Sequence, residues 1–230
     1  MGLTLHYQFQ LNSASIDQAR EKISALRQIA LTLPFQDVGE LVEIEGEECK
    51  FDPDKTDDRN SYLKLMSSKI VKIAPDTFSS LDPIHIIAFK TRVGEGCEPA
   101  AFGLAIYSPP EELNDWSWIS FCKTQYASNP DYGGVENFLK CHLMLIKMLL
   151  ETERLGILSD VLDEGNYWET RQLEELLSKV NQANVLIAAF SGKFRDMLND
   201  EGYSNTHAPI FEYPNFEYLE AEGNSNQSAP

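Results

Sequence analysis

The sequence predicts an α+β domain, in which an antiparallel-rich mixed sheet is backed by helices packed mainly on one face. Apolar and polar residues alternate near the N-terminus, as in a half-buried strand, and later segments show the three- and four-residue spacing of amphipathic helices. Two segments rich in β-branched and aromatic residues flank a glycine-rich turn, as in a hairpin. The resulting order of elements predicts a ferredoxin-like core with one extra strand.

The first elements are a strand, a helix and a second strand. Residues 3–11 alternate between apolar and polar side chains, which predicts a strand with one buried face. Ser13 or Ser15 can cap the helix that follows, and Pro34 ends it. Residues 40–45 then predict a short strand.

The middle of the chain predicts a helix over about 61–73, whose second half is also compatible with an extended conformation. Residues 75–83 predict a loop. Residues 84–93 and 100–107 predict the two strands of a hairpin, and residues 116–126 predict another strand.

The last part of the chain predicts a helix over about 135–155, a strand over 157–163 and a final helix over about 169–199. The acidic tail that follows contains several aromatic residues, which predicts that it packs on the rest of the chain. We therefore expect one domain over residues 1–220 and disorder over residues 221–230.

The charge of the chain limits its partners. Nineteen basic residues stand against 36 acidic ones, which gives a net charge of −17. Such a surface repels phosphate backbones and anionic lipid, so neither nucleic acid nor a membrane surface is an expected partner. The longest apolar stretch is too short to span a bilayer.

The cysteines and the known motifs predict a cytoplasmic protein without a cofactor. The four cysteines contain no C-x-x-C pair, which favours reduced thiols over a disulfide framework or a zinc site. The N-terminus lacks a basic-then-apolar leader. Residues 52–63 lack the glycine and the last glutamate of an EF-hand loop, and no nucleotide-binding or zinc-protease motif is present, so no metal site is predicted.

Cys122 and His142 are the candidate catalytic residues. A cysteine nucleophile needs a base or a positive field to form its thiolate, and His142 would have to reach Cys122 through a tertiary contact. Lys123 cannot take this role, because neighbours on a strand point to opposite faces. The alternative is that both residues are packed in the core, since His142 belongs to the apolar stripe of its helix.

The first strand also suggests a ligand cleft on the open face of the sheet, and the alternative is a cleft beneath the C-terminal tail. The polar side chains of the first strand lie on the face that helices leave uncovered, and that face is either wet or part of a binding site. Aromatic side chains with polar tips are frequent in pocket walls. The candidate ligand-binding residues are His6, Gln8, Trp116, Trp118, Tyr126 and Trp168.

Four stretches between about residues 94 and 168 carry a resemblance. They are GCEPAAFGLAIY, WSWISFCKTQYAS, GGVENFLKCHLMLIKMLL and DEGNYW. They resemble an uncharacterised family of bacterial proteins of about this length, for which no activity, cofactor or catalytic set is established. The resemblance implies a bacterial, cytosolic protein and transfers no functional residue.

Taken together, these features predict a soluble binding module for a small molecule or a protein partner. The alternative is an enzyme for acyl or thiol transfer that uses Cys122 as nucleophile and His142 as base. A third reading, a structural or oligomeric role, predicts a large apolar surface patch.

Overall fold

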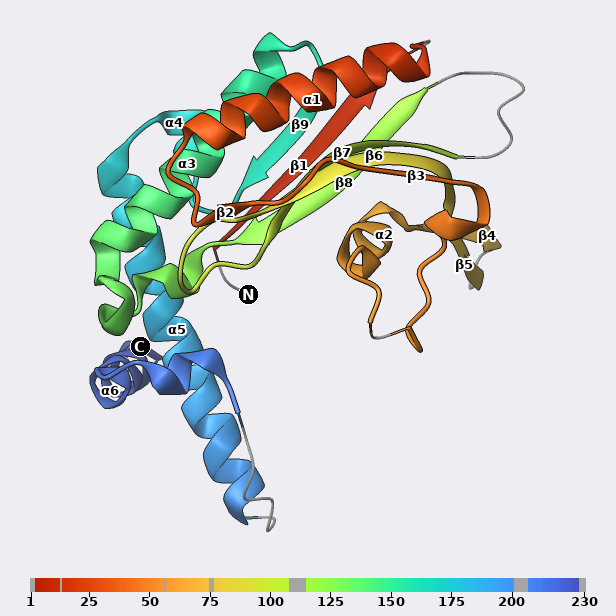
Figure 1. Cartoon of the computed structure of the whole chain (residues 1–230). Helices are drawn as coiled ribbons and strands as arrows, with labels where there is room; N and C mark the ends of the chain where they lie inside the picture. The colour runs from red at the N-terminus through yellow and green to blue at the C-terminus, as the bar shows by residue number, and fades with distance from the viewer. Residues whose placement is uncertain are drawn as a thin grey trace.

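The computed structural model describes residues 3–12, 14–55, 57–74, 77–107, 115–200 and 207–227. It has an α+β fold, built from a mostly antiparallel sheet and helices, as the sequence predicts (Figure 1). A separate two-stranded hairpin lies beside the main sheet.

The main sheet has seven strands in the part of the chain that is described. Six of them follow one another in the order β2 (Asp37–Val38), β6 (Pro83–Arg92), β7 (Ala100–Tyr107), β8 (Trp116–Lys123), β1 (Thr4–Leu11) and β9 (Leu158–Asp163). The seventh, β3 (Val42–Glu45), also pairs with β6. The predicted hairpin of β6 and β7 is confirmed.

Half of the sheet matches the ferredoxin-like expectation. Strands β8 and β9 both pair antiparallel with β1 and are therefore parallel to each other, joined by helix α3 (Gly134–Arg154) as a split β-α-β unit. The other half differs, because both β7 and β8 separate β1 from β6. Since each antiparallel pairing reverses direction, β6 runs antiparallel to β1. Strands β2 and β3 pair antiparallel with β6 and therefore run parallel to β1, so helix α1 (Ile16–Thr32) joins parallel strands that lie at opposite sides of the sheet.

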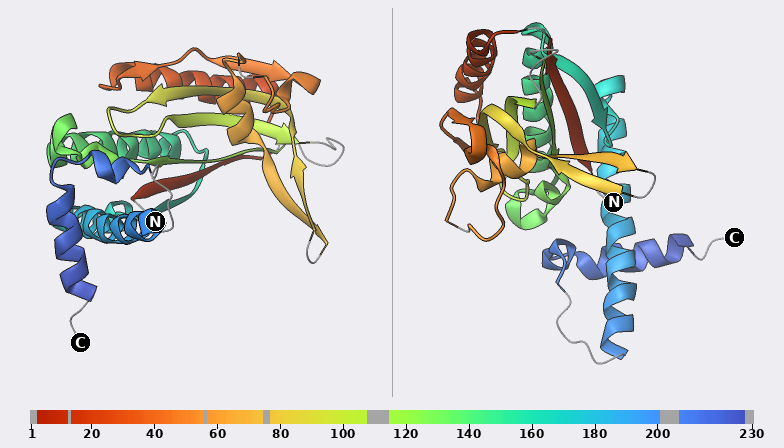
Figure 2. Two further views of the ribbon diagram at one scale, coloured as in Figure 1. Left: turned by 90° about the horizontal axis from the view of Figure 1, so that it is seen from below. Right: turned by 90° about the vertical axis from the view of Figure 1, so that its right-hand side faces the viewer.

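Helices α1 and α3 cover one face of the sheet and contact each other (Figure 2). Ser15 caps the N-terminus of α1: its hydroxyl accepts a hydrogen bond from the amide of Gln18, and the Gln18 side chain accepts one from the amide of Ser15. The spacing predicts an inner stripe from Ile16 to Leu33, and its middle is fully buried. The buried residues are Ala19, Ile23, Leu26 and Ala30, whereas Ile16 is 45% exposed and Leu33 is half-buried.

The opposite face carries a short helix, which is the first half of the helix predicted over about 61–73, and a hairpin, whose first strand takes the extended conformation left open for the second half. Helix α2 (Ser61–Ser67) ends early, and the chain continues as β4 (Lys69–Ala74), which pairs with β5 (Thr77–Leu81). The predicted loop over 75–83 is therefore wrong for residues 77–81. Local patterns missed it because β5 is stabilised by pairing with β4 rather than by a buried face of its own.

The C-terminal region forms a small unit around a long helix. A residue in the left-handed conformation, Arg171, separates α4 (Tyr167–Thr170) from α5 (Leu173–Asp200), so the predicted final helix is two helices. The tail packs on α5, as expected, through a second apolar cluster. That cluster consists of Ala188, Ile210, Tyr213, Phe216 and Leu219.

Helix α6 (Phe216–Gln227) extends past the predicted end of order at residue 220, and residues 228–230 lie outside the described part. Helix α6 continues past residue 220 because Gly223, which has no side chain, lets it lie close to Ala189 and Val185 of α5. None of the described helices is both long and apolar enough to cross a membrane.

Candidate functional site

The open face of the sheet is more apolar than its first strand suggests. His6 and Gln8 lie on this face, as predicted, and pair across to Phe121 and Ile119 of β8. Ile119 is 50% exposed and Phe121 is 41% exposed. The neighbouring strand thus brings large apolar side chains to the surface that β1 lines with polar ones.

A groove of about 940 Å³ lies between this face, helix α2 and the β4–β5 hairpin. Ile119 and Phe121 line it from the sheet together with Tyr107 of β7. Leu65 of α2 and Ile70 of β4 line it from the other side, and both are exposed. The groove is therefore an exposed apolar surface rather than a filled part of the core.

Lys69 places a cation in this apolar groove. Its ammonium group donates a hydrogen bond of 2.7 Å to the hydroxyl of Ser117 and lies 3.9 Å from the ring centroid of Tyr107. Burial lowers the pKa of Lys69. Asp82 also lines the groove and accepts hydrogen bonds from Ser68 and Ser80 at 3.0 and 3.4 Å.

None of the groove residues is among the candidates predicted from the sequence. A usable signal was present in the strand over 116–126, because Ile119 and Phe121 are apolar at positions that alternate with Trp116 and Trp118. When a strand carries apolar side chains on both faces, either other elements cover both faces or one apolar face is exposed to solvent. The β4–β5 hairpin, which forms the other side of the groove, carries no comparable pattern in its own sequence.

His6 and Gln8 lie beside the groove without lining it. The imidazole of His6 contacts the ring of Phe121, with the centroids 6.0 Å apart, and its Nε2 lies 3.9 Å from the carboxylate of Glu164. Gln8 is exposed. The two residues form a polar border on the open face.

The four predicted aromatic ligand residues are not brought together. Trp116 and Trp118 are buried on the face that α1 and α3 cover, where their indole N–H groups donate to backbone carbonyls. Tyr126 is half-buried against Tyr213, and Trp168 is half-buried at the start of α4. A single pocket built from these residues is therefore not formed.

The pairing of Cys122 with His142 is not formed either. Cys122 is fully buried, its S–H group donates to the carbonyl of Glu98 at 3.1 Å, and burial raises the pKa of its thiol. His142 is equally buried, and its two ring nitrogens lie 3.1 Å from Thr124 Oγ1 and 3.2 Å from Asp163 Oδ2. Both nitrogens of the proposed base are thus engaged elsewhere.

Asp163 stabilises the turn after β9. Its carboxylate accepts hydrogen bonds from the amides of Gly165, Tyr167 and Trp168 at 2.8, 2.9 and 2.9 Å. Burial raises the pKa of Asp163, but the hydrogen bond to His142 and these amides outweigh burial and hold the pKa below its usual value. The buried network is structural, because it satisfies the backbone of the turn that begins α4.

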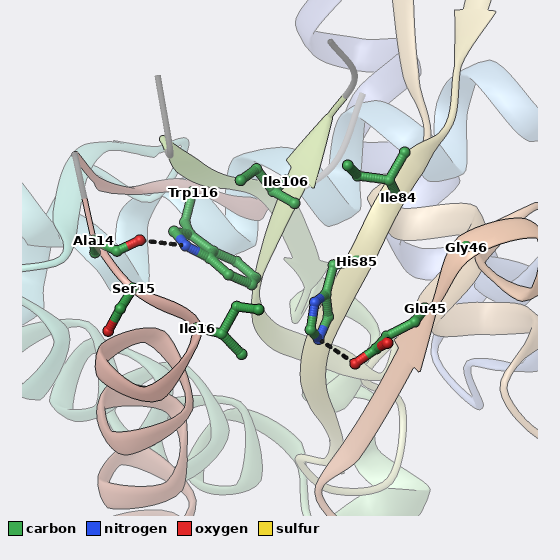
Figure 3. Close-up of a pocket in the computed structure, with 9 residues that line it drawn as sticks. All are labelled: Ala14, Ser15, Ile16, Glu45, Gly46, Ile84, His85, Ile106 and Trp116. Carbon is green, nitrogen blue, oxygen red and sulfur yellow. Dashed lines mark hydrogen bonds and ion pairs between the residues drawn. The ribbon is translucent and has the colours of Figure 1, made fainter. Parts of the chain in front are cut away.

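A second pocket, of about 610 Å³, lies between the N-terminus of α1 and strand β6 (Figure 3). Trp116 forms one wall and His85 another, with their rings 5.3 Å apart in an edge-on arrangement. Apolar side chains of Ile16, Ile84 and Ile106 complete the lining. Of the predicted ligand residues, Trp116 is the one that this pocket uses.

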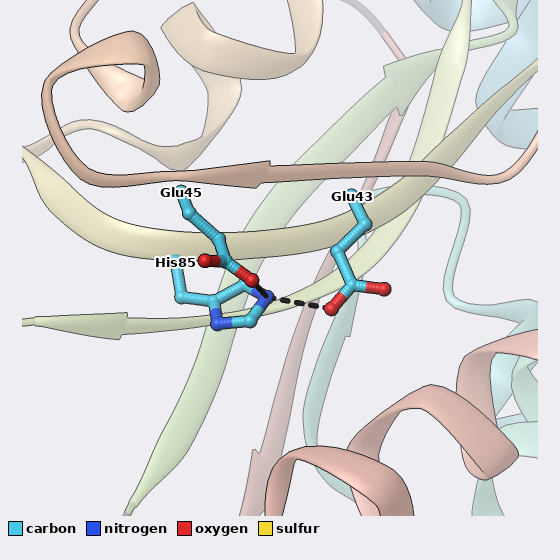
Figure 4. A group of neighbouring side chains, drawn as sticks. All are labelled: Glu43, Glu45 and His85. Atoms are coloured by element: carbon cyan, nitrogen blue, oxygen red, sulfur yellow. Dashed lines mark hydrogen bonds and ion pairs between the residues drawn. The ribbon is translucent and has the colours of Figure 1, made fainter.

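Beside this pocket, the carboxylates of Glu43 and Glu45 lie next to the imidazole of His85, and Glu45 and His85 line the pocket itself (Figure 4). His85 Nε2 lies 2.9 Å from Glu43 Oε1 and 3.7 Å from Glu45 Oε1. Arg20 of α1 donates two further hydrogen bonds of 2.8 Å to the two oxygens of Glu43 and lowers the pKa of its carboxyl group. No metal ligand is predicted from the sequence, although the E-x-E pattern of residues 43–45 is a local signal for two carboxylates on one face of a strand.

Comparison with protein-family models, curated proteins and solved structures finds none that matches this chain. Function is therefore inferred from the geometry and the chemistry of these sites.

Proposed function

We propose that this chain is a binding module that holds an apolar small molecule with an anionic group in the groove beneath the β4–β5 hairpin. The observation that carries the proposal is the ammonium group of Lys69 in a groove lined by exposed apolar side chains. The groove volume of about 940 Å³ is within the usual range for small-molecule sites.

The apolar lining supplies affinity. Ile119, Phe121 and Leu65 are each more than two-fifths exposed, so a ligand that covers them removes apolar surface from water. Each square ångström of such surface stabilises a complex by roughly 25 cal/mol before the entropic cost of association.

The charge supplies selectivity. The contacts described for Lys69 are with neutral groups, the hydroxyl of Ser117 and the ring of Tyr107. Burial disfavours its charged form, so an anionic group placed beside it restores favourable electrostatic energy. The net charge of −17 repels anions in general, and Asp82 adds a carboxylate to the groove lining, so the anionic group of a ligand belongs beside Lys69, the cation among the lining residues.

Two dyes with the same ring system test the proposal on the full chain. The sulfonated dye 1-anilinonaphthalene-8-sulfonate carries an anionic group, and N-phenyl-1-naphthylamine does not. We expect the wild type to bind the sulfonated dye more tightly. Lys69→Gln should remove most of this difference, whereas Ile119→Ser should weaken both dyes by about five- to tenfold, since it removes apolar contact.

Leu162→Ser is the matched control. Leu162 is 58% exposed on the same face of the sheet but does not line the groove, so both affinities should stay as in the wild type. Equal effects of Ile119→Ser and Leu162→Ser would contradict the proposal. Tight binding of a protein partner that Ile119→Ser abolishes, without dye binding, would favour a protein ligand instead.

A cytoplasmic location is part of the same proposal. All four cysteines of the chain are free thiols, three of them buried, which is usual for proteins kept in a reducing compartment.

A further inference from the structure

Strands β3 and β6 bring three metal-ligating side chains to one place. Glu43 and Glu45 are two residues apart on β3, so their side chains leave the same face of the strand. His85 of β6 lies directly opposite Glu45 in the antiparallel register, so its ring reaches both carboxylates (Figure 4). The arrangement follows from the strand pairing and does not depend on a loop.

The spacing of the ligand atoms suits a small divalent ion. One atom from each of the three residues lies within 4.8 Å of the other two. A tetrahedral zinc ion, about 2.0–2.2 Å from each nitrogen or oxygen ligand, requires ligand atoms about 3.3 Å apart. The separations of 2.9 and 3.7 Å from His85 Nε2 lie on either side of this value, so modest side-chain rotations suffice.

We infer that Glu43, Glu45 and His85 form a binding site for a divalent transition-metal ion such as Zn²⁺. This site is separate from the groove of the proposed function and does not rest on it. Imidazole nitrogen with carboxylate oxygen is a ligand set that zinc accepts. The ion takes the place of the hydrogen that lies between His85 Nε2 and Glu43, and the neutral imidazole that binds it through Nε2 carries its one proton on Nδ1.

Arg20 shares Glu43 with the ion and does not exclude it. The guanidinium group uses one lone pair on each oxygen of Glu43, and a carboxylate offers about four such sites. Hydrogen bonds to a ligating carboxylate fix its orientation, as outer-shell partners of metal ligands do. Arg20 also pairs with Asp17, so the three carboxylates of Glu43, Glu45 and Asp17 and one guanidinium group leave a net local charge of −2, which attracts a cation.

The adjoining pocket leaves room for a further ligand on the ion. Glu45 and His85 both line the pocket of about 610 Å³, whose other walls are largely apolar (Figure 3). Three protein ligands with one open position is the pattern of zinc sites that bind water or a small exogenous ligand. The edge of Trp116 against His85 holds the imidazole in place.

Metal titration of the full chain, after removal of metals with a chelator, tests the site. Cobalt(II) reports its coordination by visible absorption, and Zn²⁺ in competition gives its affinity. We expect one ion per chain. Glu45→Gln and His85→Gln should each lower the zinc affinity by at least about tenfold, because each removes a ligand.

Glu45→Gln is the decisive variant, because the Glu45 side chain is 72% exposed and its replacement leaves the fold intact. Glu164→Gln is the matched control, since it removes a carboxylate that lies near a histidine, His6, and within the described part of the chain no third ligating group joins this pair. An equal loss in both variants would show adventitious binding to the acidic surface and overturn the site. Absence of stoichiometric zinc binding by the wild type would also overturn it.

Discussion

His142 Nε2 and Asp163 Oδ2 lie 3.2 Å apart, and both side chains are completely inaccessible to solvent. The contact joins the middle of α3 to the end of β9, the two elements on either side of the turn at residues 155–157. It therefore connects the helix layer with an edge of the sheet. His142, a candidate base in the sequence, therefore stabilises the tertiary structure instead.

Asp163→Asn should destabilise the fold by about 2–4 kcal/mol. The amide retains one acceptor oxygen but turns donors toward the buried amides and His142, which leaves polar groups unsatisfied. Urea unfolding followed by circular dichroism measures the loss. Asp160→Asn, on the exposed side of the same strand, should change the free energy of unfolding by less than about 0.5 kcal/mol.

The same carboxylate makes stability depend on pH in acid. The pKa of Asp163 is lower in the folded chain than its value of about 3.9 in an unfolded chain. Its stabilisation is therefore fully present above pH of about 4 and is lost as pH falls through the lower, folded pKa. Urea midpoints between pH 5 and 2.5 should fall more steeply for the wild type than for Asp163→Asn. Parallel curves would contradict this assignment.

Cys122 and Cys49 should resist iodoacetamide in the native chain at pH 7. Both are buried, and burial raises the pKa of each thiol, to about 11 for Cys49, so neither forms the reactive thiolate. Mass spectrometry of labelled peptides measures the rates, with the chain in guanidinium chloride as the reference for full labelling. Faster labelling of Cys122 than of a free thiol would restore the case for a transfer enzyme.

Gly223→Ala should release the C-terminal helix from α5. An added Cβ would lie 2.6 Å from Ala189 Cβ and 2.7 Å from the carbonyl oxygen of Val185, so the two helices must separate. Limited proteolysis should then remove the tail faster while the sheet domain stays intact. Ser225→Ala, a change at an exposed position two residues away, should leave the cleavage rate unchanged.

Most of the regular elements were predictable from local patterns, because an amphipathic element records in its own sequence which face it buries. The alternation in residues 3–11 predicts β1, and the helical spacing that follows predicts α1 with Ser15 as its cap. Burial of His142 was likewise an open alternative, since it belongs to the apolar stripe of α3.

The sequence alone therefore determined the α+β class, the positions of the amphipathic helices and strands, and the acidic character that disfavours phosphate-rich partners. Only the tertiary structure decided that β5 pairs with β4, that Ile119 faces a groove, and that His85 meets Glu43 and Glu45. The physical reason is distance along the chain: His85 lies 42 residues from Glu43, and only strand pairing brings their side chains together.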